Sequence, residues 1–358
     1  MTDQKAPAGD KAPAGDTASA GDTADGEAAR RPAESDGAAP IAHWPGELVS
    51  LSVGPVFVRT APAQAGSEQA VFVHGLGGSA VNWTDLMALT SQPGALRPGT
   101  PGLAGTAPDL PGFGFSPAPA DGDYSLEARA AAIVALIERR GGSPVHLIGN
   151  SMGGAICTRI AARRPDLVAT LTLISPALPD LRPRPLPMRL ALVSAPGVGK
   201  LIMNRMRQMP AEQRTDMAIS DLYANPSLMD PERRAEAVLE VIRRDGLGYA
   251  SDALIASGRA LVGEYMRRGP GSLWADAARV TAPTLVIHGS HDRLVHPAMA
   301  ARAARTFASC RVVVLPRIGH VAMMERPDLV AAEMREFLTA AATGNGGYRH
   351  GSVQRVGG

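Results

Sequence analysis

The feature that most constrains the fold of this chain is a set of short, continuous apolar runs that end at turn residues. Two examples are T-L-T-L-I at 170–174 and T-L-V-I-H at 284–288. A strand with one face in water alternates apolar and polar residues, whereas a strand covered on both faces is apolar throughout. These runs therefore predict interior strands of an open, mostly parallel α/β sheet.

Eight such strands alternate with helical patterns along the chain. The predicted strands are Leu48–Val53, Val56–Thr60, Ala70–His74, Gly105–Asp109, Val145–Gly149, Thr170–Ile174, Thr284–His288 and Val312–Leu315. The predicted helices are Leu126–Arg140, Met152–Arg164, Pro297–Ala308 and Arg326–Ala341. Because strand–helix–strand units with short links build parallel sheets, we expect a mostly parallel eight-stranded sheet with helices on both faces.

One connection is too long to be an ordinary loop. About 110 residues (284 − 174) separate two consecutive strands, far more than connections within a compact domain usually contain. This segment opens with P-A-L-P-D-L-R-P-R-P-L-P and then becomes helical in pattern. We interpret 177–276 as a helical cap inserted into a core made of 45–176 and 277–342.

Both ends of the chain have the composition of tails. Residues 1–44 are rich in Ala, Gly, Asp and Pro, with K-A-P-A-G-D repeated at 5–10 and 11–16, and 343–358 is rich in Gly. With few large apolar residues, neither segment could recover the entropy cost of ordering. We predict that both tails are disordered.

The overall composition excludes several classes of protein. Apolar residues make up 45% of the chain and charged residues 20%, and the net charge of +2 offers no global attraction to nucleic acid. The two cysteines, Cys157 and Cys310, are too few for a disulfide framework. The start of the chain has no apolar signal and no apolar run is long enough to span a bilayer, so the expected location is cytoplasmic.

The sequence G-N-S-M-G-G at 149–154 lies between a predicted strand and a predicted helix. A G-x-S-x-G motif in that context predicts a sharp turn that exposes Ser151 as a nucleophile. A serine hydroxyl attacks only when a base takes its proton, so it must project where a base can reach it. Gly149 and Gly153 lack the side chains that would collide in so tight a turn.

Three further segments supply the rest of a catalytic apparatus. H-G-L-G-G at 74–78 predicts an oxyanion loop, with the backbone N–H groups of Leu76 and Met152 as donors. Asp292 and His320 each follow a predicted strand, where the loops of parallel sheets gather ligands. His320 is the predicted base and Asp292 the acid that orients it, in the chain order Ser, Asp, His.

Other residues near these motifs have alternative roles. We assign His288, His291 and His296 to local polar packing, and Asp109 in D-L-P-G-F-G to the organisation of a turn; Asp180 is a less favoured acid. His74 and Trp83 are predicted to line the substrate site, with His74 also orienting the oxyanion loop. No residue spacing predicts a metal site, and the chemistry needs no cofactor.

These motifs together resemble the α/β-hydrolase superfamily, in its branch of serine hydrolases with a helical cap. The resemblance covers residues 45–341 and includes V-H-G-L-G-G at 73–78, D-L-P-G-F-G at 109–114, D-R-L-V at 292–295 and G-H at 319–320. Such families include carboxylesterases, lipases, hydrolases of ring-cleavage products and cofactor-free perhydrolases. The resemblance implies cleavage of a small-molecule ester or related acyl bond through an acyl-enzyme.

The elbow resembles that of the hydrolases that break carbon–carbon bonds in ring-cleavage products, which is the alternative activity. Those enzymes usually carry H-G-x-G-P-G and a Trp after the catalytic His, whereas this chain has H-G-L-G-G-S and Val321. A non-catalytic ligand-binding module on the same scaffold is a third hypothesis.

The predicted cap is rich in Met and Arg, which admits several interpretations. Flexible Met side chains could line an acyl pocket and an Arg could receive a substrate carboxylate. The same residues could instead pack helices and cover a solvated face, or apolar cap helices could rest on lipid. The residues concerned are Met188, Met203, Met206, Met209, Met217, Arg182, Arg184, Arg189, Arg205 and Arg207.

Overall fold

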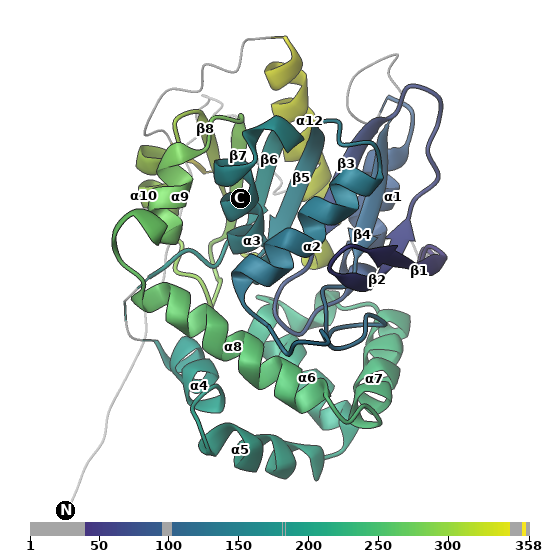
Figure 1. The fold of residues 1–358 in the computed structure, drawn as a ribbon, viewed down its shortest axis with the longest axis vertical. Coiled ribbons are helices and arrows are strands. Elements are labelled where there is room, and N and C mark those ends of the chain that lie inside the picture. The colour runs from purple at the N-terminus through teal and green to yellow at the C-terminus, as the bar shows by residue number, and fades with distance from the viewer. Residues whose placement is uncertain (1–39, 95–101, 181, 183, 344–352, 356–358) are drawn as a thin grey trace, which may run out of the picture. The chain divides into compact units, whose positions relative to one another are not determined.

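The computed structural model describes residues 40–94, 102–180, 182, 184–343 and 353–355 (Figure 1). Residues 1–39 form a separate unit from Pro40–Gly358. Most of the predicted N-terminal tail, and most of the predicted C-terminal tail, therefore lie outside the described residues.

Nine strands form one sheet in the order β1-β2-β4-β3-β5-β6-β7-β8-β9. The first two strands pair antiparallel with their neighbours and the remaining pairs are parallel. The strands are β1 Gly46–Leu51, β2 Gly54–Thr60, β3 Glu68–Val73, β4 Leu103–Pro108, β5 Val145–Asn150, β6 Val168–Ile174, β7 Thr284–Gly289, β8 Cys310–Leu315 and β9 Val353–Arg355. The mostly parallel α/β sheet predicted from the apolar runs is confirmed.

The sheet has one strand more than the eight expected. The additional strand, β9, lies inside the segment that the sequence assigned to a disordered tail, and it pairs with β8 at Val312–Val314. V-Q-R is too short to show a strand pattern, and only the free edge of β8 provides the pairing groups that make it one.

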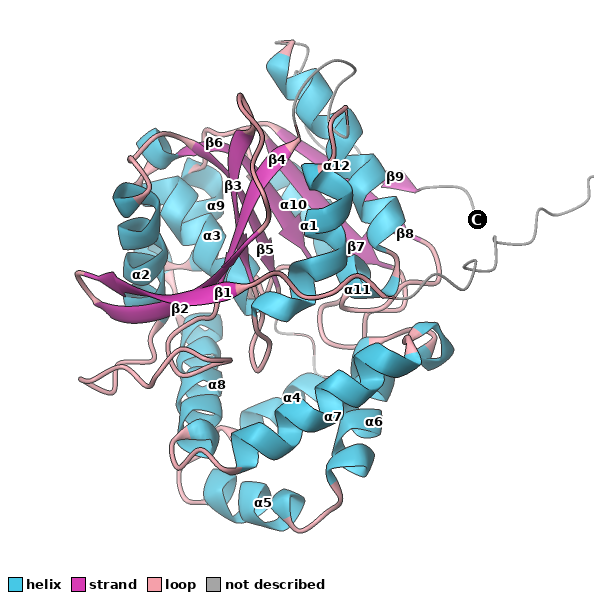
Figure 2. Cartoon of the chain, turned by 90° about the vertical axis from the view of Figure 1, so that its right-hand side faces the viewer, coloured by secondary structure: helices cyan, strands magenta, loops and turns pink. Residues whose placement is uncertain are grey.

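Helices cover both faces of the sheet (Figure 2). Alternate residues of one strand point to opposite faces, so Val71 packs with α2 and α3 while Phe72 packs with α1 and α12. The core helices are α1 Thr84–Ser91, α2 Leu126–Arg139, α3 Met152–Arg163, α9 Leu273–Arg279, α10 Met299–Thr306, α11 Ala322–Glu325 and α12 Pro327–Ala342. The sequence predicted α2, α3, α10 and α12 but missed α1, α9 and α11, which have only eight, seven and four residues.

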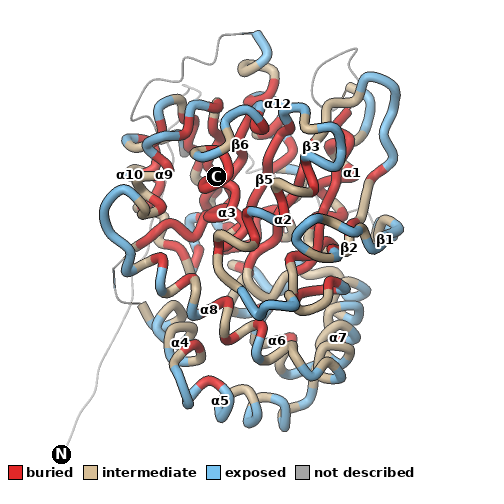
Figure 3. The backbone as a smooth tube through the Cα atoms, viewed as in Figure 1, coloured by how far each residue is buried: buried red, intermediate tan, exposed pale blue. Residues whose placement is uncertain are grey.

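Of the six α-helices described between β6 and β7, the first five lie at one end of the sheet (Figures 1 and 2). We call them the inserted helices: α4 Pro185–Val193, α5 Val198–Arg207, α6 Ala211–Leu222, α7 Pro231–Asp245 and α8 Ala250–Met266. The boundary predicted at residue 276 falls inside α9, and α9 packs against α3 in the core. Burial is concentrated in the core, whereas α4–α7 are half-buried or exposed over most of their length (Figure 3).

One buried ion-pair network ties the inserted helices to the core. Arg159 of α3, which is 1% exposed, donates to Glu264 of α8 at 2.7 Å and to Asp276 of α9 at 3.0 Å. Breaking a buried pair leaves an uncompensated charge, which costs roughly 3–5 kcal/mol. This network therefore fixes where α8 lies against the helix that follows Ser151.

No single helix among the described residues is long and apolar enough to cross a membrane. The consecutive pair α4 and α5, bent by 103°, passes that test together on length and composition alone.

Candidate active site

Ser151 stands at the turn between β5 and α3, with a backbone φ of 52° and ψ of −118°. A residue other than glycine at positive φ is strained by about 1–3 kcal/mol and persists only when its surroundings hold it. The surroundings do so here, because the Ser151 N–H donates to the Ile174 carbonyl at 3.1 Å. The Ser151 carbonyl in turn accepts from the N–H groups of Ala155 at 3.1 Å and Ala177 at 2.9 Å.

The two glycines that flank Ser151 are required by close backbone contacts. A Cβ at Gly149 would lie 2.6 Å from the Gly153 carbonyl oxygen, and one at Gly153 would lie 2.1 Å from the Val73 carbonyl oxygen. Since real Cβ atoms do not approach so closely, the packing of β3, β5 and α3 demands glycine at both positions.

His320 and Asp292 are joined by a hydrogen bond of 2.9 Å between His Nδ1 and Asp Oδ2, and both side chains are buried. The other carboxylate oxygen accepts from the N–H groups of Leu294 at 2.8 Å and Val295 at 2.9 Å. Burial alone would raise the pKa of Asp292, but the His320 ring and the Val295 N–H hold it below its usual value. Asp292 is therefore a carboxylate, and it fixes Nδ1 of His320 as the donor.

The remaining ring nitrogen of His320, Nε2, is buried and has no hydrogen-bond partner among the described residues. In a serine hydrolase this is the nitrogen that takes the proton of the nucleophile. A buried nitrogen without a partner is costly, so its retention points to a partner that arrives during function.

Backbone and side-chain contacts bring the three predicted loops together. The side-chain amide of Asn150, which precedes Ser151, donates to the His320 carbonyl at 3.2 Å and to the Ile174 carbonyl at 3.0 Å. A Cβ at Gly75 of the oxyanion loop would lie 3.1 Å from Ser151 Cβ. The predicted nucleophile, the predicted base and the predicted oxyanion loop therefore converge at the carboxyl ends of β3, β5, β7 and β8.

His74 organises the oxyanion loop from inside the core. Its Nδ1 lies 2.7 Å from the Gly75 carbonyl oxygen and its Nε2 accepts from the Leu110 N–H at 2.9 Å, so the ring is neutral with its proton on Nδ1. Burial lowers the pKa of His74 to about 4, which keeps it neutral. His74 thus links two loops, and both of its nitrogens are occupied by backbone groups rather than left for substrate.

The proposed oxyanion donors differ in exposure. Met152 is fully buried at the first position of α3, where the backbone N–H has no partner within the helix. Leu76 is half-buried and packs against the core cluster, and a Cβ at the next residue, Gly77, would lie 3.6 Å from Leu254 of α8. Met152 follows Ser151 directly and the loop of Leu76 approaches the inserted helices; their role as oxyanion donors stays a prediction.

Trp83 has a different position from the one expected. It is fully buried in the core, where its ring packs against Phe72 at a centroid distance of 5.5 Å. This is the environment of a core residue, and it contradicts the prediction that Trp83 lines the substrate site.

Asp109 has the turn-organising position expected of it. Its carboxylate accepts from the N–H groups of Ala80 at 2.6 Å and Phe115 at 2.8 Å, so it links the D-L-P-G-F-G loop to the end of the oxyanion loop.

His288 is a buried histidine beside the pair Asp292 and His320. Neither of its ring nitrogens has a hydrogen-bond partner among the described residues. Burial lowers its pKa to about 4, against the attraction of Asp292. His288 therefore remains neutral at physiological pH and adds no charge next to His320.

Sequence reasoning missed Glu325, a buried carboxylate five residues after His320. Glu325 Oε2 accepts from the Gly319 N–H at 2.7 Å and the Ala224 N–H at 3.2 Å, and Oε1 accepts from the Asn225 N–H at 3.1 Å. The His320 N–H donates to the carbonyl of Leu222, the last residue of α6, at 2.7 Å. Glu325 thus holds the loop of His320 against the end of α6. In the sequence, only its spacing from G-H and its place before Arg326–Pro327 could have indicated this role.

Two arginines near the end of α7 reach the core loops around the site. Arg244 donates to the Gly77 carbonyl of the oxyanion loop at 3.1 Å, and Arg243 donates to the Gly114 carbonyl at 2.6 Å. The inserted helices are therefore in direct contact with the oxyanion loop as well as with the loop of His320. Among the described residues no group of three or more His, Cys, Asp or Glu side chains is placed to hold a metal ion.

The fold and these contacts agree with the comparison with known proteins. The sequence model of the alpha/beta hydrolase fold family matches residues 71–327. The chain belongs to this family.

Individual relatives in the family differ in activity. The chain is 28% identical to the dihydrolipoyllysine-residue acetyltransferase component of the acetoin cleaving system of Pseudomonas putida, over 76% of this chain and 64% of the relative. It is 25% identical to Lipase 1 of Psychrobacter immobilis, over 81% of this chain and 82% of the lipase. It is also 25% identical to 2-hydroxymuconate semialdehyde hydrolase of Pseudomonas putida, over 66% of this chain and 76% of that hydrolase. The family match, the lipase and the semialdehyde hydrolase support a hydrolase.

Proposed function

We propose that the protein is a serine hydrolase that cleaves a carboxylic ester through an acyl-enzyme on Ser151. One observation carries the proposal: the hydrogen bond between Asp292 and His320 leaves His320 Nε2 buried and without a partner among the described residues, while the His320 carbonyl accepts from Asn150, the residue before Ser151. A lipase among the relatives supports the ester as the bond attacked.

The reaction begins when Ser151 Oγ attacks the ester carbonyl and its proton passes to His320 Nε2. The N–H groups of Leu76 and Met152 then stabilise the oxyanion, and a single donor of this kind lowers the barrier by about 3–4 kcal/mol. His320 returns the proton to the leaving alcohol, which leaves an acyl-serine. Water, deprotonated by the same nitrogen, releases the acid and restores Ser151.

We also propose that the inserted helices act as a cap that forms one wall of the substrate site. This is supported by the contacts of Leu222 with the His320 N–H and of Arg244 with the oxyanion loop. The substrate is then a small molecule held between these helices and the carboxyl ends of the strands. A cytoplasmic location stays a prediction from the sequence.

The alternative activity is cleavage of a carbon–carbon bond in a ring-cleavage acid. The observations that favour it are the sequence G-N-S-M-G-G and the relative that acts as a 2-hydroxymuconate semialdehyde hydrolase. The same three side chains would serve, so substrate preference rather than site geometry separates the two activities.

The test combines one variant with two substrate series. Wild type and Ser151→Ala are assayed on p-nitrophenyl esters of increasing acyl length and on a dienoic ring-cleavage acid. We expect ester turnover to fall at least about a thousandfold in Ser151→Ala. Ser91→Ala, at the end of α1 and away from the site, is the matched control and should keep wild-type rates.

Two outcomes would contradict the proposal. Full ester turnover by a folded Ser151→Ala protein would exclude the acyl-serine, and a strong preference for the dienoic acid would favour the carbon–carbon hydrolase. A folded wild type that a fluorophosphonate probe fails to label would instead favour a binding module.

A further inference from the structure

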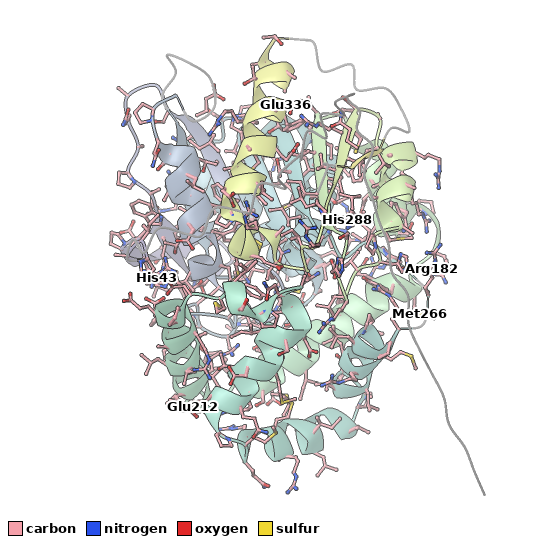
Figure 4. All side chains as sticks on the ribbon, turned by 180° about the vertical axis from the view of Figure 1, so that it is seen from behind. His43, Arg182, Glu212, Met266, His288 and Glu336 are labelled. Carbon is pink, nitrogen blue, oxygen red and sulfur yellow. The ribbon has the colours of Figure 1, made fainter. Side chains whose placement is uncertain are left out.

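The chain contains one segment from which acidic residues are missing. Across residues 181–211 the sequence has no Asp or Glu, although the whole chain contains 34 acidic against 36 basic residues. The same segment carries six basic residues: Arg182, Arg184, Arg189, Lys200, Arg205 and Arg207. The first acidic side chain after it is Glu212, at the start of α6 on the inserted helices (Figure 4). A local net charge of +6 therefore sits on a chain that is nearly neutral overall.

This segment folds as α4 and α5, which also present large apolar side chains to solvent. Met188 and Leu192 of α4 lie four residues apart and share one face, with exposed fractions of 60% and 53%. Val198 and Leu201 of α5 lie three apart and share another, and Leu201 is 72% exposed. Helix α5 lies at the edge of the inserted helices farthest from the sheet (Figures 1 and 2).

Lys200, Arg189 and Arg205 remain available to an outside partner. Arg184 and Arg207 do not, because they pair with Asp180 and Asp245. Lys200 is paired with Asp252 at 3.1 Å, but both side chains are more than half exposed. Arg189 lies 3.8 Å from Asp221, and Arg205 donates to the neutral amide of Gln208. Ion pairs as exposed as these contribute about 0–1 kcal/mol, so an anion can displace them.

From this combination we propose that α4 and α5 form a docking surface for a membrane that contains anionic lipid. Basic residues beside exposed apolar residues on short helices are the signature of helices that lie in the membrane interface. With nine and ten residues, α4 and α5 are each too short to span a bilayer, which takes about 20 residues. The cationic charges attract the lipid head groups, and the apolar side chains enter the boundary with the acyl chains. The proposal does not depend on the catalytic role of Ser151.

The experiment measures partition of the full chain onto vesicles by co-sedimentation. Vesicles of phosphatidylcholine alone are compared with vesicles that contain 30% phosphatidylglycerol, a composition chosen for the test, at low and high salt. We expect binding to the anionic vesicles, weaker binding to the neutral ones, and loss of the difference at high salt because salt screens the attraction.

Three variants separate the parts of the surface. Leu201→Asp should weaken binding at least about tenfold, since it removes an inserting side chain and adds a negative charge. Arg205→Glu should weaken binding to anionic vesicles about 25-fold, because each charge near such a surface contributes about fivefold. Leu239→Asp is the matched control: Leu239 is also a 65% exposed helical leucine, but the four arginines of its helix α7 are balanced by four acidic residues. It should bind like wild type.

Several outcomes would overturn the proposal. Equal binding to neutral and anionic vesicles, no binding to either, or equal loss in Leu201→Asp and Leu239→Asp would each do so. If Leu201→Asp changes the oligomeric state in light scattering but not vesicle binding, the surface is instead a contact between copies of this chain. Ester turnover of the wild type is measured without vesicles. A failure of the protein to bind vesicles would therefore not contradict the proposed hydrolase activity.

Discussion

Two regions of the molecule differ sharply in burial. The core is represented by helix α3, which follows Ser151, and the inserted helices by their first member, α4. Ten of the twelve residues of α3 are buried, whereas none of the nine residues of α4 is. The strained turn at Ser151 can exist because the buried region around it leaves no alternative arrangement. The inserted helices are held to this buried region by polar contacts of Glu264, Glu325 and Arg244, and by apolar side chains that belong to the core clusters, such as Ile219 and Leu261.

This difference assigns separate tasks to the two regions. Proton transfer and oxyanion stabilisation need atoms held within a fraction of an ångström, which only dense packing provides. Selection of a substrate, or docking on a surface, tolerates looser packing. We therefore expect changes in the core to alter the chemical step and changes in the inserted helices to alter what is bound.

The largest effect is expected from Asp292→Asn. The amide keeps the shape of Asp292 but can no longer hold the proton of His320 on Nδ1, so Nε2 cannot act as a base. We expect kcat for ester hydrolysis to fall about ten-thousandfold, as for an equivalent change in another serine hydrolase. Steady-state kinetics with a thermal melt as the control for folding would measure this. A fall of less than tenfold would mean that Asp292 does not orient the base.

The next prediction tests the packing contrast directly. Ile160→Ala in α3, where the side chain is 2% exposed, should lower the free energy of unfolding by about 2–5 kcal/mol. Leu192→Ala in α4 removes a 53% exposed side chain and should change it by no more than about 0.5 kcal/mol. Urea unfolding of both variants gives the comparison, and similar losses would show that α4 is as tightly packed as α3.

The pH dependence of stability should report the buried histidine His288. Its pKa is about 4 in the folded chain and 6.5 ordinarily. Because the unfolded chain takes up the proton first, stability is lost as pH falls from 6.5 to 4, by about 3 kcal/mol for this group. His288→Phe should reduce the difference in stability between pH 7 and pH 4.5.

The matched control for this prediction is His291→Phe, at an exposed histidine three residues along the chain. Since each variant is compared with itself at two pH values, any packing change from the ring cancels. An unchanged pH slope in His288→Phe would show that His288 does not titrate as a buried group.

The smallest effect is expected from Glu325→Gln, at the contact between the two regions. The amide oxygen of Gln can still accept from backbone N–H groups, but its nitrogen cannot. At least one of the bonds from Gly319, Ala224 and Asn225 is therefore lost, and each contributes about 1 kcal/mol. We expect kcat to fall about tenfold with KM nearly unchanged, because the loop of His320 is displaced. Glu325→Asp should restore part of the rate. A loss of stability with unchanged kcat would make Glu325 a structural residue only.

Much of this architecture could be predicted because it is local. The apolar runs at 170–174 and 284–288 predicted β6 and β7, and G-N-S-M-G-G predicted a strand-to-helix turn, since each depends on neighbours along the chain. The helices α1 and α9 were missed because eight and seven residues are too few for a clear periodicity. The strand β9 was missed because it depends on the edge of β8.

The roles of Glu325, Asn150 and Trp83 could not be predicted for a related reason. Glu325 acts on Ala224 and Asn225, about 100 residues away, and no local pattern identifies such partners. Trp83 is close to the oxyanion loop in sequence, yet its ring points into the core against Phe72. Its proximity to that loop in the sequence therefore led to the wrong prediction that Trp83 lines the substrate site.

By itself, then, the sequence determined the parallel sheet, the turn at Ser151, and Asp292 and His320 as its candidate partners. It could do so because periodicity and short motifs are properties of adjacent residues. The tertiary structure alone decided that Asp292 holds His320 at 2.9 Å, that Asn150 and Glu325 hold the loop of the base, and that α4 and α5 leave their apolar and basic side chains exposed. These depend on distances between residues far apart in the chain, which only packing sets.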